Sequence, residues 1–202
     1  MLSGPVEWGV AARCRRGEAA NGDAAVVTLL PDGVVVAGID GLGHGIQAAH
    51  AARTAAEVVR ASPSQDLAAL VERCHVALRG TRGAAISLAF LSAAGSGMTW
   101  LGVGNVEGRV LSGDPWERRP KGSLALVSGV PGHVLPRVST ATLEVRPGDV
   151  LVFATDGVQA AFADSLDTSG STQAISERIM ADHGRLLDDA LVVAVRYLGT
   201  RP

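Results

Sequence analysis

Short apolar runs separated by glycine, proline and aspartate dominate the first part of the chain. Residues 24–30 and 34–39 are two such runs, and the Pro-Asp-Gly sequence at residues 31–33 between them is typical of a hairpin turn. Residues 5–12 alternate weakly between apolar and polar positions and indicate an earlier strand. We therefore expect the chain to begin with antiparallel strands.

Helical spacing replaces this pattern in three places. Residues 46–60 are rich in alanine and apolar on nearly every face, which predicts a tightly packed helix. Ser62 is followed by proline and, three positions on, by Gln65, a pattern that predicts a helix starting there and ending at Gly80. Residues 172–183 predict a third helix, which a glycine follows.

From residue 83 onward the pattern predicts a meander of short strands. Residues 112–137 are rich in proline and glycine and indicate a loop with short strand pieces. The strands expected in this half are 84–91, 98–103, 109–111, 140–145, 150–154 and 190–198. With the helices, they indicate an α+β class with mainly antiparallel strands.

Composition narrows the classes of function. The chain has 202 residues, which fits one domain spanning 1–202, and its net charge of −2 argues against a nucleic-acid partner. No apolar run is long enough for a bilayer span, so we expect no membrane partner. Cys14 and Cys74 match no metal or redox spacing, which indicates reduced thiols and a cytoplasmic protein.

Aspartates recur at the ends of the apolar strands. Asp40 closes the second run, and glycines follow it at positions 41, 43 and 45, so the backbone there can approach a ligand closely. Asp23 precedes the first run, and the hairpin places it at the same sheet edge as Asp40. Asp156 and the pair at 188–189 flank later strands in the same way.

Carboxylates gathered at one edge suit a hard divalent cation, because Mg²⁺ and Mn²⁺ prefer oxygen ligands. Without a cation such carboxylates would repel one another strongly. Two ions about 3.5–4 Å apart are a standard device for hydrolysing phosphoesters with an activated water. A single Asp-Gly pair such as Asp32-Gly33 is more simply a turn, so the recurrence is the evidence for a metal site.

A dinucleotide site is the alternative interpretation of the glycine-rich segment. A β-branched strand followed by spaced glycines and a helix imitates the opening of such a fold. The third glycine of that motif is replaced by Ile46, and Arg60 and Ala61 stand where a ribose-binding acid is expected. No strand–helix–strand alternation follows, which disfavours this alternative.

Taken in order, the motifs resemble the SpoIIE-type bacterial branch of the metal-dependent PPM (type 2C) serine/threonine phosphatases. They are Asn-Gly-Asp at 21–23, Asp-Gly-Leu-Gly-His-Gly at 40–45, Thr-Asp-Gly-Val at 155–158 and Asp-Asp at 188–189. The likeness covers nearly the whole chain and is greatest to the small stand-alone stressosome phosphatases. It implies an αββα sandwich of two mainly antiparallel sheets, flanked by helices, with metals at one edge.

The resemblance also implies a ligand set for two Mn²⁺ or Mg²⁺ ions. Asp40 would bridge both ions, with Asp23 and the Gly41 carbonyl at one and Asp156 and Asp188 at the other. The family pattern places the ligand first in the acidic pair, so Asp188 is preferred over its neighbour. The candidate metal ligands are Asp23, Asp40, Gly41, Asp156, Asp188 and Asp189, and the candidate catalytic residues are Asp40, Asp156 and Asp188.

Three features depart from the family pattern. Leu191 stands where a threonine or serine usually follows the acidic pair. Eukaryotic relatives have a histidine directly after Asp-Gly, whereas here Leu42 occupies that position and His44 comes two residues later, so no general acid is assigned. The arginines within residues 13–16 belong to no recognisable phosphate-binding motif.

The function expected from the resemblance is a cytoplasmic protein phosphoserine/phosphothreonine phosphatase. Its partners would be phosphorylated STAS-domain proteins of the stressosome scaffold type. Two alternatives stay open. One is a catalytically weak pseudophosphatase that acts as a binding module, and the other is a phosphatase of an anti-sigma-factor antagonist.

Overall fold

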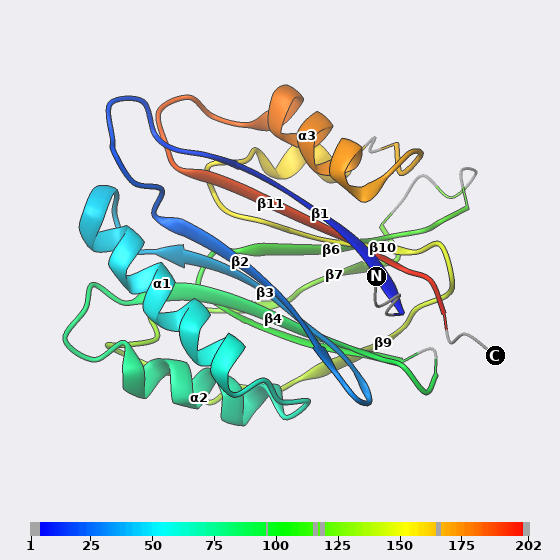
Figure 1. Ribbon diagram of the computed structural model, residues 1–202, viewed down its shortest axis with the longest axis horizontal. Coiled ribbons are helices and arrows are strands. Elements are labelled where there is room, and N and C mark those ends of the chain that lie inside the picture. Colours follow the sequence, from blue (N-terminus) through cyan, green and yellow to red (C-terminus); the bar gives the residue numbers. More distant parts are fainter. Residues whose placement is uncertain (1–4, 96, 115–116, 118–119, 165–166, 200–202) are drawn as a thin grey trace.

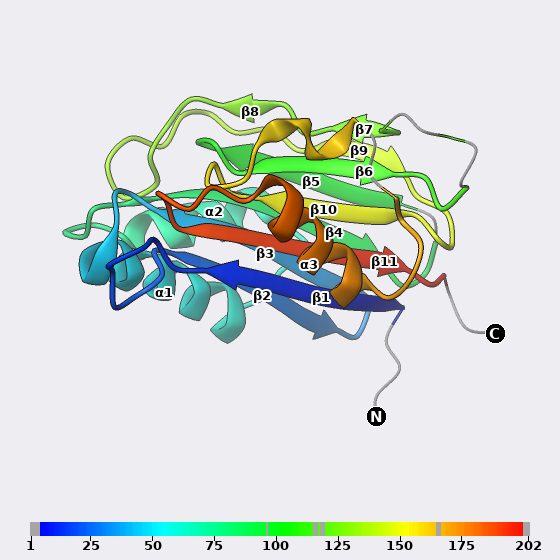
Figure 2. The ribbon, with the colours of Figure 1, turned by 90° about the horizontal axis from the view of Figure 1, so that it is seen from above.

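The computed structural model describes residues 5–95, 97–114, 117, 120–164 and 167–199. Two β-sheets lie face to face, with helices on the outer side of each (Figure 1, Figure 2). This arrangement confirms the expected α+β class and the αββα sandwich.

One sheet contains the strand that begins the described chain and the strand that ends it. Its order is β1-β11-β10-β6-β7, and every neighbouring pair is antiparallel. The strands are β1 (Val6–Arg13), β6 (Glu107–Leu111), β7 (Gly122–Ser123), β10 (Val150–Ala154) and β11 (Ala190–Tyr197). Helix α3 (Thr172–His183) packs on the outer face of this sheet, against β1 and β11.

The second sheet has the order β2-β3-β4-β5-β8, and β9 also pairs with β5. All pairs are antiparallel except β5 with β8, which makes this sheet mixed. The strands are β2 (Asp23–Leu30), β3 (Gly33–Gly41), β4 (Ala84–Ser92), β5 (Gly97–Val103), β8 (Leu126–Val127) and β9 (Ala141–Glu144).

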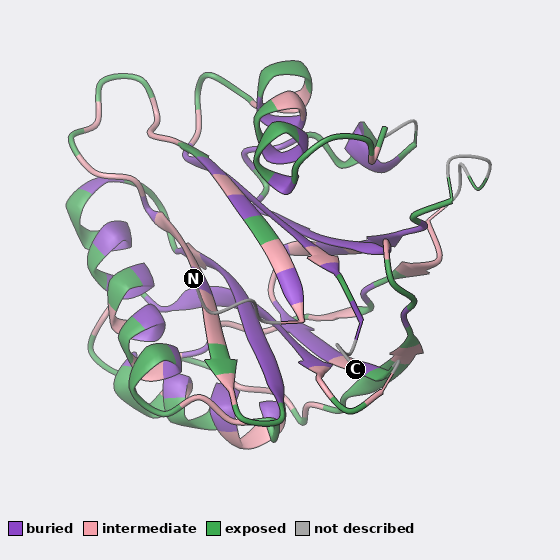
Figure 3. Cartoon of the chain, turned by 45° about the vertical axis from the view of Figure 1, so that its right-hand side comes forward, coloured by how far each residue is buried: buried purple, intermediate pink, exposed green. Residues whose placement is uncertain are grey.

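Strand β3 is buried on both faces, which explains why its sequence is apolar at successive positions. Val34 and Val36 point between the two sheets, where they join a core that includes Phe153 and Val193. The intervening residues, such as Val35, belong to a second core beneath the helices. Because both faces of the strand are covered, neither set of positions needs to be polar. In Figure 3 the central strands of both sheets are buried, and the helices are buried on the side that faces a sheet and exposed on the other side.

Helices α1 (Gly45–Ala61) and α2 (Leu67–Ala77) cover the outer face of the second sheet. The prediction that the second helix starts at Ser62 is wrong. Ser62 ends α1, since its N–H donates to the carbonyl of Val58, and the N-cap of α2 is Asp66, whose side chain accepts from the N–H of Ala69. A short 3₁₀ turn at Ala160–Ala163 completes the helical elements of the described residues. None of the described helices combines the length and apolar character needed to cross a membrane.

Candidate metal centre

The hairpin of β2 and β3 brings two carboxylates together. Asp23 begins β2 and lies directly opposite Asp40, near the end of β3. This register confirms the pairing expected from the Pro-Asp-Gly turn. The N–H of Gly41 donates to the carbonyl of Gly22 (2.9 Å), which extends the ladder by one bond beyond the aspartates.

The aspartates next to β10 and β11, in the other sheet, lie at the same end of the molecule. Strand β10 ends at Ala154, opposite Val192 of β11, so the segment after β10 and the segment before β11 lie side by side. Asp156 follows β10, and the acidic pair at 188–189 precedes β11. The two sheets therefore bring acidic residues from four separate segments to one edge.

These segments enclose a cavity of about 340 Å³ at that edge. All five predicted aspartates line it. Gly41 is not among the lining residues, although it directly follows Asp40 in the chain. The residues that line the cavity are Arg15, Asp23, Asp40, Leu42, Gly43, His44, Asn105, Asp156, Asp188 and Asp189.

Two glycines allow the backbone segments around the cavity to approach closely. A Cβ atom on Gly41 would lie 2.1 Å from the carbonyl oxygen of Ala48 in α1. One on Gly157 would lie 1.8 Å from the carbonyl oxygen of Asp189. Any larger side chain at either position would push apart the strand ends that hold the aspartates.

The two members of the acidic pair differ in their environment. Asp189 is buried, and its carboxylate accepts from the N–H groups of Arg15 (2.8 Å) and Gly22 (3.0 Å). It therefore fastens the β1–β2 segment to the start of β11. Asp188 is partly exposed, and its Oδ1 accepts from the N–H of Asp189 (3.0 Å). The geometry thus favours Asp188 as a ligand and Asp189 as a structural anchor.

Thr155 links the two sheets through its side chain. Its hydroxyl donates to Oδ2 of Asp23 (2.8 Å) and accepts from the N–H of Leu191 (2.9 Å). Thr155 is 1% exposed, so this contact is shielded from water. The side chain of Leu191 is buried in the core and only its backbone takes part.

Two cavity contacts involve residues to which the sequence analysis gave no ligand role. Asn105 has the features of a turn residue, yet its side-chain amide donates to Oδ2 of Asp156 (2.7 Å). His44 is at the N-cap position of α1, but its side chain accepts no hydrogen bond from the first turn of that helix. Its Nδ1 instead pairs with Oε1 of Glu18 (2.5 Å). No sequence signal points to Glu18, because it lies in an irregular segment 26 positions away.

Burial and mutual repulsion disfavour charge on these aspartates. Burial, together with the charge of Asp40, raises the pKa of Asp23 to about 8. Burial, together with the charge of Asp156, raises the pKa of Asp40 to about 7. The pKa of Asp156 is also raised, by burial and by Asp188. Within the described chain no ion pair involves any of the four, so a cation would relieve the repulsion.

The donor set fits a hard divalent cation. Every candidate side chain offers carboxylate oxygens, which Mg²⁺ and Mn²⁺ prefer. Among the described residues no three His, Cys, Asp or Glu side chains already form a metal cage. A bound ion would therefore complete its coordination with water, as Mg²⁺ commonly does.

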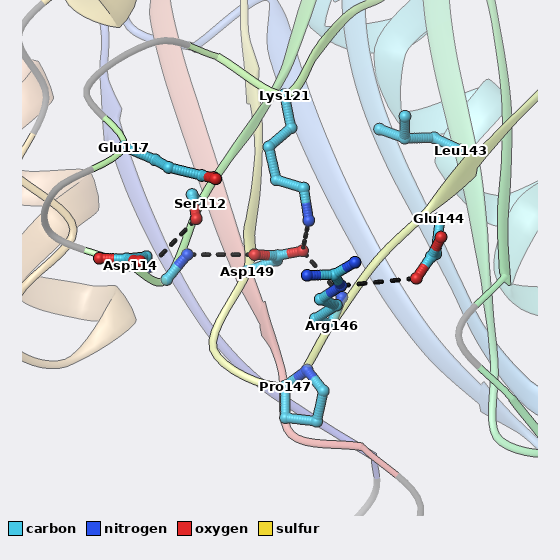
Figure 4. A pocket seen from close by; sticks show the side chains of 10 residues that line it. Ser112, Asp114, Glu117, Lys121, Leu143, Glu144, Arg146, Pro147 and Asp149 are labelled. Carbon is cyan, nitrogen blue, oxygen red and sulfur yellow. Dashed lines mark hydrogen bonds and ion pairs between the residues drawn. The ribbon is translucent and has the colours of Figure 1, made fainter.

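A second cavity, of about 430 Å³, lies beside the turn between β9 and β10 (Figure 4). Its buried carboxylate, Asp149, is fully used within the protein. It accepts from the N–H groups of Gly113 (3.1 Å) and Arg146 (2.8 Å) and from Nζ of Lys121 (2.5 Å). These contacts fasten the turn and leave the carboxylate no role toward a ligand.

Comparison with known proteins agrees with the geometry. The family model for stage II sporulation protein E (SpoIIE) matches residues 31–198. A structure from work on the bacterial stressosome as a modular system adapted to control secondary messenger signalling is 29% identical, with a TM-score of 0.83, covering 95% of this chain and 99% of that one. RsbX in complex with magnesium is 22% identical, with a TM-score of 0.83, covering 95% and 94%.

A third similar structure holds the PP2C phosphatase domain of SpoIIE from Bacillus subtilis. It is 16% identical, with a TM-score of 0.74, covering 100% of this chain and 66% of that one. No curated protein sequence matches the chain. PP2C phosphatases are metal-dependent, and the RsbX structure contains magnesium. The chain belongs to the SpoIIE family of PP2C-type serine/threonine phosphatases.

Proposed function

We propose that this protein is a metal-dependent protein phosphoserine/phosphothreonine phosphatase with its active site in the aspartate-lined cavity. The observation that supports it most is the meeting of Asp23, Asp40, Asp156 and Asp188 from both sheets in one cavity. Their raised pKa values and the lack of a paired cation among the described residues fit a site for divalent ions.

The proposed ligand set holds two Mn²⁺ or Mg²⁺ ions. Asp40 is opposite Asp23 in the hairpin and repelled by Asp156, so it is the best placed to serve both ions. The carbonyl of Gly41 is proposed as a further ligand. Asp189 is a weaker candidate because backbone N–H groups already occupy its carboxylate.

Bound divalent ions lower the pKa of a water ligand and neutralise charge on the phosphoryl oxygens. The protein's own residues orient the site: Thr155 holds Asp23, and Asn105 holds Asp156. Arg15 lies in the cavity wall, where its positive charge attracts a phosphoryl group. Among the described residues no serine, threonine or cysteine lines the cavity, and its aspartates are the proposed metal ligands, so we take a water molecule as the nucleophile.

The substrate we propose is a phosphorylated STAS-domain protein of the stressosome scaffold type, dephosphorylated in the cytoplasm. The similarity to RsbX and to the structure from the stressosome work supports this choice. A phosphorylated anti-sigma-factor antagonist is the competing substrate. Initial rates of phosphate release from both proteins, each phosphorylated by its cognate kinase, decide between them. Faster release from the antagonist would overturn the scaffold assignment.

A pseudophosphatase of the same fold is the remaining alternative. The departure from the family pattern at Leu191 would favour it, but the side chain of Leu191 is buried and only its N–H reaches the site, through Thr155. The complete carboxylate set favours an enzyme. Hydrolysis of p-nitrophenyl phosphate in Mn²⁺, abolished by EDTA, is the expected result. No hydrolysis under either condition would favour the binding module.

A further inference from the structure

We propose that the mouth of the aspartate-lined cavity is a docking surface for a folded phosphoprotein that carries apolar and acidic side chains around its phosphorylated residue. This inference rests on the proposed phosphatase function. It adds an apolar rim, formed by Leu42, Ile46, Leu186 and Leu187, and a set of mouth arginines, formed by Arg15, Arg16, Arg82 and Arg185.

The four side chains of the apolar rim are exposed to solvent instead of packed in the core. Ile46 is 70% exposed, Leu186 67% and Leu187 78%, while Leu42 is 38% exposed and lines the cavity itself. Leu187 immediately precedes the candidate ligand Asp188. Clustered large apolar side chains at the entrance to a polar site favour contact with a partner over contact with water.

The mouth arginines lie around the same opening without ion-pair partners in the described chain. Arg15 lines the cavity. The guanidinium of Arg82 lies over the glycine-rich segment, 2.7 Å from where a Cβ of Gly43 would be. The N–H of Arg185 donates to the carbonyl of Gly157 (2.7 Å), which places Arg185 beside the segment that carries Asp156. Unpaired guanidinium groups are suited to phosphoryl and carboxylate groups of a partner.

Backbone contacts join the loops that carry these side chains. The N–H of Arg16 donates to the carbonyl of Leu186 (3.5 Å), which places the β1–β2 loop beside the α3–β11 loop. The N–H of Leu42 donates to the carbonyl of Gly83 (3.0 Å), which joins the β3–α1 and α2–β4 loops. In both Figure 1 and Figure 2 these loops form one end of the molecule.

The size of the cavity requires that a phosphoprotein substrate keep its bulk outside. A cavity of about 340 Å³ admits a phosphorylated side chain but not the domain that bears it. The surface around the phosphorylated residue must then rest on the apolar rim and the mouth arginines. Because the rim comes from two separate segments, the β3–α1 loop with the first turn of α1 and the α3–β11 loop, a broad folded surface contacts more of it than an extended peptide does.

The test compares a phosphorylated STAS-domain protein with p-nitrophenyl phosphate, using the double variant Ile46→Asp/Leu187→Asp. The matched control is Leu198→Asp, since Leu198 is 50% exposed beyond the opposite end of β11. We expect the double variant to lower the ratio of kcat/KM for the phosphoprotein to kcat/KM for the aryl phosphate about tenfold, mainly through KM. Leu198→Asp should leave the ratio unchanged. An unchanged ratio in the double variant would overturn the docking surface.

Binding separates this inference from the proposed activity. Calorimetric titration measures docking without hydrolysis if both proteins carry Asp40→Asn, which prevents turnover. The phosphoprotein is titrated in Mn²⁺ into Asp40→Asn alone and into Asp40→Asn combined with the double variant. Two results would support the docking surface. The double variant should bind the phosphoprotein more weakly, and added salt should weaken binding more in protein that retains Arg82 than in the Arg82→Ala variant. Equal binding contradicts the docking surface, even if the wild type hydrolyses aryl phosphate. Concentration-dependent self-association that the double variant abolishes would instead assign the rim to a second copy of the chain.

Discussion

Asp23 and Asp40 lie directly opposite each other on neighbouring antiparallel strands, so two carboxylates are held side by side by backbone hydrogen bonds. Like charges at opposed positions destabilise a sheet. The hairpin therefore stores an electrostatic cost that a divalent cation removes. This relationship makes stability depend on both pH and metal.

In metal-free protein, stability should fall as pH rises from about 4 to about 8. The pKa of Asp23, about 8, and that of Asp40, about 7, both lie above the unfolded value of about 3.9. Between these values the folded state binds more protons than the unfolded state, so raising the pH favours unfolding. Urea unfolding in EDTA at pH 5.5 and pH 8.0 measures the effect. Asp40→Asn should reduce the difference, and equal stability at both pH values would refute the explanation.

Mn²⁺ should restore that stability, because the clustered carboxylates bind cations only when the chain is folded. At a concentration 100-fold above the dissociation constant we expect a rise in Tm of about 5–10 °C. The rise should shrink in Asp23→Asn and Asp156→Asn, each of which removes one proposed ligand. Differential scanning calorimetry with and without Mn²⁺ gives the comparison. A full-sized shift in both variants would exclude this cavity as the binding site.

Thr155→Val should weaken both folding and metal binding. The variant keeps the shape of the buried side chain but leaves the N–H of Leu191 without an acceptor and Asp23 without a donor. Leaving a buried group unsatisfied costs about 1–3 kcal/mol. Urea unfolding and Mn²⁺ titration measure the two effects, with Thr155→Ser as the control that retains the hydroxyl. Matching losses in the serine variant would point to the methyl group instead.

Substitutions at the two residues of the acidic pair should have different effects, one on stability and the other on Mn²⁺ binding. Asp189→Asn cannot accept from both Arg15 and Gly22, so we expect a loss of about 1–3 kcal/mol in the free energy of unfolding. Asp188→Asn retains an oxygen for the N–H of Asp189, so it should fold normally but bind Mn²⁺ poorly. Parallel unfolding and calorimetric titrations compare the variants. The reverse pattern would make Asp189 the ligand.

Local patterns in the sequence predicted much of this site. The Pro-Asp-Gly turn set the register that opposes Asp23 and Asp40, and the apolar run before Asp156 placed that residue at a strand end. The role of Asp189 was not predictable, because its N–H partners come from positions 167 and 174 residues away. The start of α2 was mispredicted because Ser62 serves as the last cap of α1.

Phosphate release from a kinase-phosphorylated STAS-domain protein is the sharpest test of metal-dependent hydrolysis at Asp40. We expect turnover by the wild type in millimolar Mn²⁺, none in EDTA, and a loss of at least about 100-fold in folded Asp40→Asn. Circular dichroism checks that the variant is folded. Turnover in EDTA, or wild-type rates in Asp40→Asn, would rule out metal-dependent hydrolysis at Asp40.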